Sequence, residues 1–426
     1  MRNWRRFVQF MVYMGFCFPL KAQLPAFDTT RYTLQQADRR FLQKNLLLLA
    51  QKYNVKASQA LILQSRLWNN PNITVSQGVY NPKTEKYFQT GPFDGEEAVD
   101  LQQLFLLAGK RNKQIRIAQT NYQLAEDGLF DLLRTLKFTL QTDFYHIYYL
   151  EQSTGVYQEE INSLSKVVQA FNEENGKGYI AETEVVRIKA QLYSLENEYN
   201  DLGNQLNDVQ SEFRLLIQQP QVYLVPQIDS AELEGFNPEE FPLQTLIDSA
   251  FHNRTDLRIA RDNLLLSKQY YSYQKALAIP DLTLGASYDK NGSYVHNYNS
   301  ISASFDLPFF NRNQGNIRYS KNQVDFNGME LKSVEQSLED EVARALQKAV
   351  DADKLYRSLS PGFSAEFDRL AQQVLINYQK RNISLLDFLD FYNSYKENVL
   401  QMDQIRFNRV SAFEQINFVT GTEFFR

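Results

Sequence analysis

The feature that most constrains this 426-residue chain is an internal repeat, offset by about half the chain length. Three pairs of segments show it: Leu34-Gln35 and Leu243-Gln244, the residues after Pro71 and after Pro280, and residues 180–184 and 383–387. The offset stays between roughly 200 and 210 residues, so the two copies follow each other in tandem. The fold must therefore be one that can be built twice from the same unit.

Each copy is expected to contain a helix, two strands, a very long helix and a further helix. Apolar residues at spacings of three and four predict the first-copy helices at residues 36–69 and 109–172, and a last helix that ends near residue 218. The strands are predicted at residues 72–79 and 99–105, with a loop over residues 81–97. The second copy repeats this order, with helices predicted at residues 244–278, 312–379 and 385–420.

The predicted strands have one apolar and one polar face. In the second copy, Ile301 and Phe305 alternate with Ser302 and Ser304. Alternation of this kind in strands of about ten residues is typical of membrane-spanning β-structure, in which one face meets lipid. A soluble hairpin with one buried face has the same pattern, so the strands alone leave both interpretations open.

The helices are long for a compact domain. Residues 185–216 carry an apolar stripe whose spacings alternate between three and four, which indicates a coiled-coil seam. At about 1.5 Å per residue, the half-length helices span roughly 50 Å and the long helix roughly 100 Å. These lengths predict that each copy has one helix of full length beside two half-length helices that stack end to end.

The first residues have the features of an export signal. A basic start at residues 2–6 precedes an apolar run, and Leu20-Lys21-Ala22 provides a cleavage site. The single cysteine, Cys17, lies in this run, so the mature chain would contain no disulfide. Removing residues 1–22 takes away four basic residues and lowers the formal net charge from −5 to −9. An acidic chain of this kind is a poor candidate for binding nucleic acid.

No enzymatic motif accompanies the repeat. The three histidines, His146, His252 and His296, are scattered, and there is no glycine-rich phosphate loop or nucleophile motif. We therefore expect no enzymatic activity, no cofactor and no dedicated metal site.

Four strands per chain are too few to close a membrane barrel, which begins at about eight strands. Because open strand edges are not tolerated in lipid, a chain with membrane strands must oligomerise. The expected fold is mainly α-helical with membrane β-structure: in a trimer, tandem-duplicated coiled-coil helices form an α-barrel, and four strands per protomer complete a twelve-stranded β-barrel. The expected segments are a signal peptide (1–22), a first repeat (23–219), a linker (220–242) and a second repeat (243–426).

These features together resemble the TolC family of outer-membrane efflux proteins, over essentially the whole mature chain. The duplication, the strands led by Pro71 and Pro280, and the two helical bends all match. The resemblance implies a homotrimeric channel in the outer membrane of a Gram-negative bacterium, with a helical barrel in the periplasm. It also implies a periplasmic adaptor and an inner-membrane efflux pump as partners, outer-membrane lipid around the strands, and small molecules or metal cations as cargo.

The two bends match best. The family has a tyrosine before the second bend and an Asp-x-x-Asp pair after it, which correspond to Tyr378, Asp387 and Asp390. In the first bend, Thr183 and Glu184 match a family Thr-Asp pair whose acid holds the tyrosine in the closed state. The resemblance implies that these five residues line a periplasmic aperture, where rings of aspartates would favour cations. The alternative role of the aspartates is to complement the dipole of the following helix.

The chain departs from the family at one position of the second bend. The arginine that some members use as a second latch is replaced by Ile383, and Arg381 is the candidate to take over its role. The other bend residues are candidates for contact with the adaptor, although turn chemistry alone also explains Gly178 and Asn382. These candidates are Gly178, Tyr179, Ile180, Asn382, Ile383 and Ser384.

Two other functions stay open at this point. A periplasmic coiled-coil adaptor or scaffold would share the heptad helices, but it would not carry a strand pair at equal distance from the bends in both copies. A conduit for type I protein secretion would share the whole architecture, and the sequences of the bends do not separate it from an efflux channel.

Overall fold

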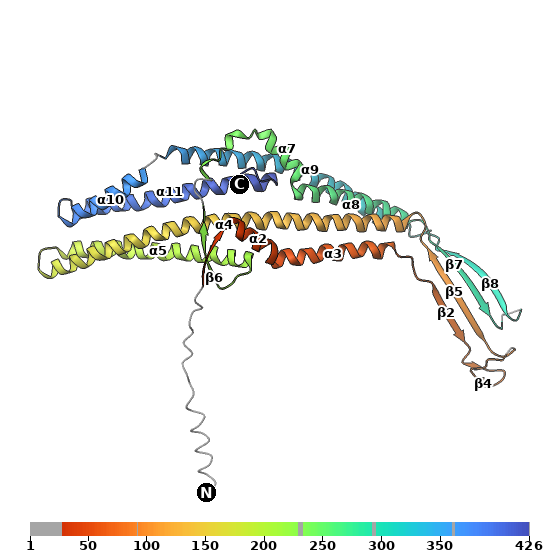
Figure 1. Cartoon of the computed structure of the whole chain (residues 1–426). Coiled ribbons are helices and arrows are strands. Elements are labelled where there is room, and N and C mark those ends of the chain that lie inside the picture. Colours follow the sequence, from red (N-terminus) through yellow and green to blue (C-terminus); the bar gives the residue numbers. More distant parts are fainter. Residues whose placement is uncertain (1–27, 92, 229–232, 292–294, 360–362, 426) are drawn as a thin grey trace, which may run out of the picture.

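The computed structural model describes residues 28–91, 93–228, 233–291, 295–359 and 363–425. The helices lie side by side along one long axis, with a β-sheet at one end and two helical bends at the other (Figure 1). The predicted signal peptide at residues 1–22, with Cys17, lies outside the described residues.

The first copy follows the predicted order of elements. Its helices and strands are β1 (Asp28–Thr33), α2 (Leu34–Lys44), α3 (Leu46–Arg66), β2 (Asn72–Gln77), β5 (Glu97–Phe105), α4 (Lys110–Gly176) and α5 (Glu182–Ile217). The segment predicted as a loop contains a small hairpin formed by β3 (Tyr80–Asn81) and β4 (Lys86–Tyr87). With 67 residues, α4 spans roughly 100 Å, as expected for a helix that runs the full length of the molecule.

The second copy repeats this order. Its elements are β6 (Val222–Gln227), the 3₁₀ helix η1 (Pro238–Glu240), α7 (Leu243–Asn253), α8 (Thr255–Leu277), β7 (Leu282–Asp289), β8 (Tyr298–Phe305), α9 (Gln314–Ser358), α10 (Phe363–Gln379) and α11 (Leu385–Thr420). None of the helices in the described parts of the chain combines the length and apolar character needed to cross a bilayer.

Three helices predicted as continuous are divided, and these predictions were wrong. Asn45 interrupts the first helix because its side chain accepts a hydrogen bond from the Leu48 amide (3.1 Å) and donates one to the Leu216 carbonyl (3.0 Å). Arg254 interrupts the corresponding helix of the second copy with an extended backbone. The long helix of the second copy ends at Ser358, shortly before Pro361, whose ring disfavours helix in the residue that precedes it.

The four predicted strands form one antiparallel sheet with the order β2-β5-β7-β8. Its register places Ile73 opposite Leu101, Leu101 opposite Ala286, and Ala286 opposite Ile301. Residues that are directly opposite point to the same face, so these four apolar residues, one from each strand, share one face. That face is uncovered in the single chain, where Ile73 is 66% and Ile301 is 89% exposed.

The order of the helices repeats the order of the strands. Near the sheet, α4 packs against α3 on one side and α8 on the other, and α8 packs against α9. Towards the bends, α4 packs against α5 and α11. The helix order α3-α4-α8-α9 therefore matches the strand order β2-β5-β7-β8, and each strand extends the helix that is next to it in the chain. The chain forms one segment of a wall, with α3 and β2 along one margin and α9 and β8 along the other (Figure 1).

A second, parallel pair of strands lies halfway along the helices and was not predicted. β1 pairs with β6 from Asp28–Val222 to Thr33–Gln227. β6 lies in the segment that we expect to link the repeats, and its Val222 and Leu224 are buried. Gln210 of α5 fixes this pair, because its side chain both accepts a hydrogen bond from the Leu224 amide (3.0 Å) and donates one to the Leu224 carbonyl (2.7 Å).

Candidate functional site

The two bends at the end opposite the sheet have the same backbone geometry. Gly178 in the first bend and Arg381 in the second both adopt left-handed backbone conformations, with φ of 76° and 62°. In each bend the amide of the next residue donates back to a carbonyl of the preceding helix, from Tyr179 to Glu174 (3.0 Å) and from Asn382 to Asn377 (2.9 Å). Such a closure uses carbonyls that the helix end would otherwise leave unpaired.

The second bend leads into α11 through a capping box. The Ser384 hydroxyl donates to the Asp387 carboxylate (2.6 Å) and accepts a hydrogen bond from the Asp387 amide (3.2 Å). The carboxylate of Asp387 therefore takes part in capping α11, and its place in the first turn also lets it complement the helix dipole, the alternative role given above. Asp390, one turn further on, is exposed on the same side of the helix as Asp387.

Tyr378 is held by aromatic packing. Its ring is only 5% exposed and lies between the rings of Phe388, at a centroid distance of 4.3 Å, and Phe171, at 5.4 Å. These rings belong to the apolar core that joins α4, α5, α10 and α11 just above the bends. The ring of Tyr378 is therefore part of the packing between the two copies.

The hydroxyl of Tyr378 has no hydrogen-bond partner among the described residues. Burial, and secondarily the negative charge of Glu184, raise the pKa of this hydroxyl well above its ordinary value. Thr183 and Glu184 themselves are exposed at the start of α5. The structure thus brings Glu184 close enough to act on Tyr378 electrostatically, but it does not join them by a hydrogen bond.

Arg381 links the two bends of the chain. Its guanidinium lies 3.6 Å from the Glu174 carboxylate at the end of α4. Lys177 of the first bend contacts the same carboxylate at 3.0 Å. Both cations are largely exposed, so the individual pairs contribute little to stability. Glu174 was not among the residues singled out from the sequence.

The residues predicted to contact an adaptor lie at the tips of the bends. Tyr179 is 67% exposed, and Gly178, Asn382 and Ser384 are exposed as well. Ile180 and Ile383, which occupy equivalent positions in the two bends, are half-buried. The Ile180 carbonyl accepts a hydrogen bond from the Asn175 side chain (2.9 Å), which fixes the first tip.

A polar junction above the bends was not foreseen from the sequence. The Glu198 carboxylate of α5 accepts hydrogen bonds from the Tyr157 hydroxyl of α4 (2.9 Å) and from the Lys396 ammonium of α11 (2.5 Å). Gln191 of α5 donates to Asn393 of α11 (2.8 Å) closer to the bends. The sequence holds one signal for this junction: Lys396 follows the buried Tyr392 by four residues, so a charged side chain lies on the inward face of α11.

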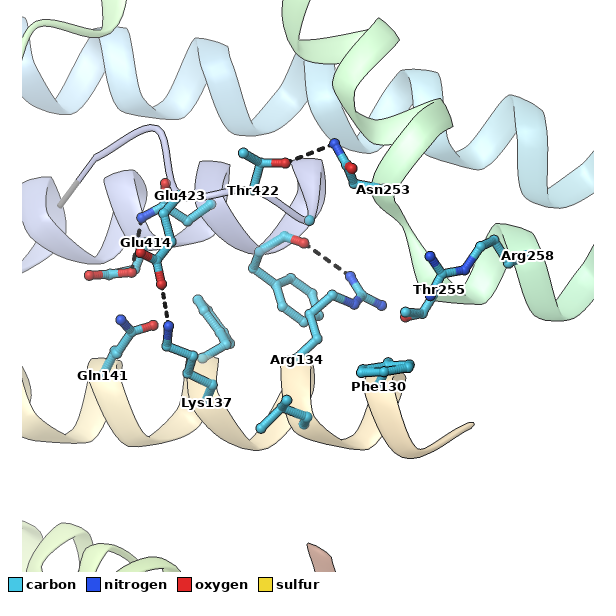
Figure 2. A pocket seen from close by; sticks show the side chains of 15 residues that line it. Phe130, Arg134, Lys137, Gln141, Asn253, Thr255, Arg258, Glu414, Thr422 and Glu423 are labelled. Carbon is cyan, nitrogen blue, oxygen red and sulfur yellow. Dashed lines mark hydrogen bonds and ion pairs between the residues drawn. The ribbon is translucent and has the colours of Figure 1, made fainter. Parts of the chain in front are cut away.

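A cavity of about 380 Å³ lies halfway along the molecule, between α4, the end of α11 and the junction of α7 and α8 (Figure 2). Arg134 donates to the Phe418 carbonyl (3.0 Å) and to Asp131 (2.8 Å), and Lys137 pairs with Glu423. Because these cations pair with groups of the chain itself, we interpret the cavity as a junction that holds the end of α11 against α4.

Duplicated long helices, a four-stranded sheet with an uncovered apolar face, and paired bends at the opposite end define the fold of this chain. Residues 246–421, which span α8, the β7–β8 strand pair, α9, α10, α11 and most of α7, match the family model described as outer membrane efflux protein. The resemblance inferred from the sequence is thereby confirmed. None of the curated proteins compared with the chain matches it significantly.

Solved structures with the same fold cover nearly the whole chain. The Campylobacter jejuni CmeC outer membrane channel has a TM-score of 0.75 and 14% identity, over 92% of this chain and 86% of that one. The Neisseria gonorrhoeae MtrE outer membrane channel, in its open state, has a TM-score of 0.69 and 18% identity, over 92% and 89%. The Vibrio cholerae outer membrane protein VceC has a TM-score of 0.64 and 16% identity, over 92% and 96%.

Proposed function

We propose that this chain forms an outer-membrane channel through which a tripartite pump exports small molecules or metal cations. The observation that carries the proposal is the single four-stranded sheet, whose strand order repeats the helix order and whose apolar face is uncovered. A soluble scaffold would leave this face in water, where apolar side chains are disfavoured. Lipid around the strands removes that cost, and the helices then extend the channel into the periplasm.

The two margins of the wall support a trimer. β2 and β8 are the outer strands of the sheet, and each has one unpaired edge in the single chain. Different surfaces meet when β8 of one copy joins β2 of the next, and such head-to-tail contacts close into a ring. Three copies give twelve strands, which satisfies the requirement that a membrane sheet has no open edge. The proposed repeats are residues 23–219 and 243–426, joined by residues 220–242 after a signal peptide at residues 1–22.

The aperture is assigned to the end with the two bends. Thr183, Glu184, Asp387 and Asp390 are exposed there, and Tyr378 packs directly behind them. Rings of carboxylates from three copies would favour cations at this mouth. We further propose that the ion pair between Arg381 and Glu174 replaces the missing latch arginine, because it ties the second bend to the first.

The tips are the proposed contact surface for a periplasmic adaptor, which would connect the channel to an inner-membrane pump. Exposed Tyr179 and the equivalent isoleucines Ile180 and Ile383 offer apolar surface for such a contact. The channel itself would perform no chemistry and need no cofactor, since the pump supplies the energy.

The first test is single-channel conductance of the purified protein in a planar bilayer. Discrete, cation-preferring steps, together with a trimer mass in detergent, are the expected result. A protein that stays soluble without detergent and gives no steps would contradict the proposal and favour a coiled-coil scaffold.

The aperture has its own test in the double variant Asp387→Asn and Asp390→Asn. We expect reduced cation preference with an intact trimer, because the charges are removed while the asparagine can still cap α11. Unchanged ion selectivity would remove these residues from the aperture. The matched control is Asp201→Asn with Asp208→Asn, which removes two charges from α5 far from the bends.

A further inference from the structure

Six basic residues without an ion pair gather where the sheet meets the helices. No aspartate or glutamate occurs between residues 101 and 125 or between residues 307 and 324. Among the described residues, none of the six lies within ion-pair distance of a carboxylate, although the buried Lys110 beside them pairs with Asp281 (2.7 Å). We call these six the basic belt: Arg111, Lys113, Arg116, Arg312, Arg318 and Lys321.

The belt borders the apolar face of the sheet. Phe105 lies on that face, at the end of β5, and Trp68 packs edge-on against it at a centroid distance of 6.5 Å. The Arg111 guanidinium lies over the Trp68 ring at 4.5 Å, and it donates to the Arg66 carbonyl through Nε (3.1 Å). A continuous path of contacts therefore leads from the apolar face, through an exposed indole, to a cation.

The second copy repeats this arrangement with different residues. After β8 the chain exposes Leu307, Phe309 and Phe310, the last of which is 97% exposed. Arg312 follows two residues after Phe310, and Arg318 and Lys321 are exposed on the first turns of α9. Large apolar side chains with cations on one side only are the arrangement that suits the boundary between hydrocarbon and lipid headgroups.

We propose that the basic belt binds the phosphate groups of acidic phospholipids in the periplasm-facing leaflet of the membrane. This inference rests on the proposed function, since it needs the apolar face to lie in lipid. The belt is basic although the chain as a whole is acidic, with a net charge of −5, so acidic headgroups would be attracted to the level where the sheet meets the helices. Three copies would repeat the belt at the same level around the proposed ring, where a shell of lipid headgroups can reach it.

The test uses the full-length protein in nanodiscs made of zwitterionic lipid with one part in three of phosphatidylglycerol, and counts retained lipids by native mass spectrometry. We expect the wild type to enrich the acidic lipid over the zwitterionic one. The variant Arg111→Gln, Arg116→Gln, Arg318→Gln should lose about fivefold in acidic-lipid affinity for each basic residue removed. The enrichment should also fall on raising the salt from about 0.15 to 1 M.

Two controls keep the outcome clear. Arg39→Gln, Lys44→Gln, Lys52→Gln removes three exposed cations from α2 and α3 away from the belt and should retain the enrichment. Arg111→Lys keeps the charge and should retain it too. Equal enrichment by the wild type and the belt variant, or none by the wild type, would overturn the inference while leaving the channel intact. Failure of every protein to enter the discs would instead overturn the proposed function, and the inference with it.

Discussion

The ring of Tyr378 lies parallel to the ring of Phe388, with the centroids 4.3 Å apart and an interplanar angle of 9°. The hydroxyl on the same ring is buried without a hydrogen-bond partner in the described chain. The second bend is therefore held to α11 by stacking, and the oxygen adds no bond to it in this conformation.

Replacing Tyr378 separates the ring from its hydroxyl. Tyr378→Phe should keep or slightly raise the thermal stability, because a buried hydroxyl without a partner costs about 1–3 kcal/mol. Tyr378→Ala should lose about 3–5 kcal/mol, as is usual when a buried aromatic ring is deleted, and should increase leak conductance. Thermal unfolding and bilayer recordings of both variants test this. A leak in Tyr378→Phe equal to that in Tyr378→Ala would show that the hydroxyl holds the aperture instead.

Arg381 adopts a conformation that favours glycine, as its counterpart Gly178 shows. A left-handed backbone costs a residue with a side chain about 1–2 kcal/mol, whereas an exposed ion pair contributes about 0–1 kcal/mol. Arg381→Gly should therefore be more stable than Arg381→Ala by roughly 1 kcal/mol, although both lose the contact with Glu174. Thermal unfolding of the two variants measures the difference. If both also conduct more than the wild type, and Glu174→Gln does as well, the ion pair acts as a latch.

Lys396 is the cation of the junction above the bends and is 9% exposed, whereas Glu198 is 35% exposed. Burial alone would raise the pKa of Glu198, but hydrogen bonds from Lys396 and Tyr157 bring it below its ordinary value. Lys396→Met should destabilise the protein by about 1–3 kcal/mol, because it leaves the carboxylate with fewer donors. Adding Glu198→Gln should recover part of this loss, and a double-mutant cycle of unfolding temperatures measures the coupling. Additive effects would contradict a shared junction.

Asp143 of α4 should make the stability depend on pH. Burial, and secondarily the charge of Glu212, raise its pKa from 3.8 to about 8, and its Oδ2 has no hydrogen-bond partner among the described residues. The folded state thus holds this proton more tightly than the unfolded state. Below pH 4 the contribution of Asp143 to the free energy of unfolding does not change with pH. As the pH rises from 4 towards 8, the free energy of unfolding falls by at most about 1.4 kcal/mol per pH unit.

The variant Asp143→Asn should lack this part of the pH dependence. Unfolding temperatures of the wild type and the variant, compared between pH 5 and 8, provide the test. Glu212→Gln is the matched control, because it removes the neighbouring charge and keeps the buried acid. Parallel curves for wild type and Asp143→Asn would assign the decline to other carboxyls, such as Glu151 and Glu414, whose pKa values burial raises to about 7.

Most of the fold could be predicted because its determinants are local and occur twice. The helix predicted at residues 385–420 matches α11, since a serine cap and a glycine after the last turn mark its ends. The interruption at Asn45 could not be predicted, because it depends on the Leu216 carbonyl, 171 residues away. The pair β1–β6 joins segments about as far apart, and Pro226 within β6 argued against a strand.

The site was less predictable than the fold. The residues of the bends could be named because turns and caps have short-range signatures, such as Ser384 with Asp387. Pairing between bends has no such signature, which is why Glu174 was missed as the partner of Arg381. The burial of Tyr378 between two rings likewise depends on how α4 meets α11, and sequence periodicity does not fix the rotation of one helix relative to another.

The different edges at β2 and β8 have a consequence for mixed populations of subunits. A copy with a proline at Ala303 of β8 would still offer β2 to a neighbour but could not accept the next copy. Such a copy would join a growing assembly and stop it from closing. If half of the subunits in a cell carried the change, only about one in eight of the proposed three-copy rings would contain three intact copies. A defect on one edge of one strand would therefore be dominant over the normal gene product.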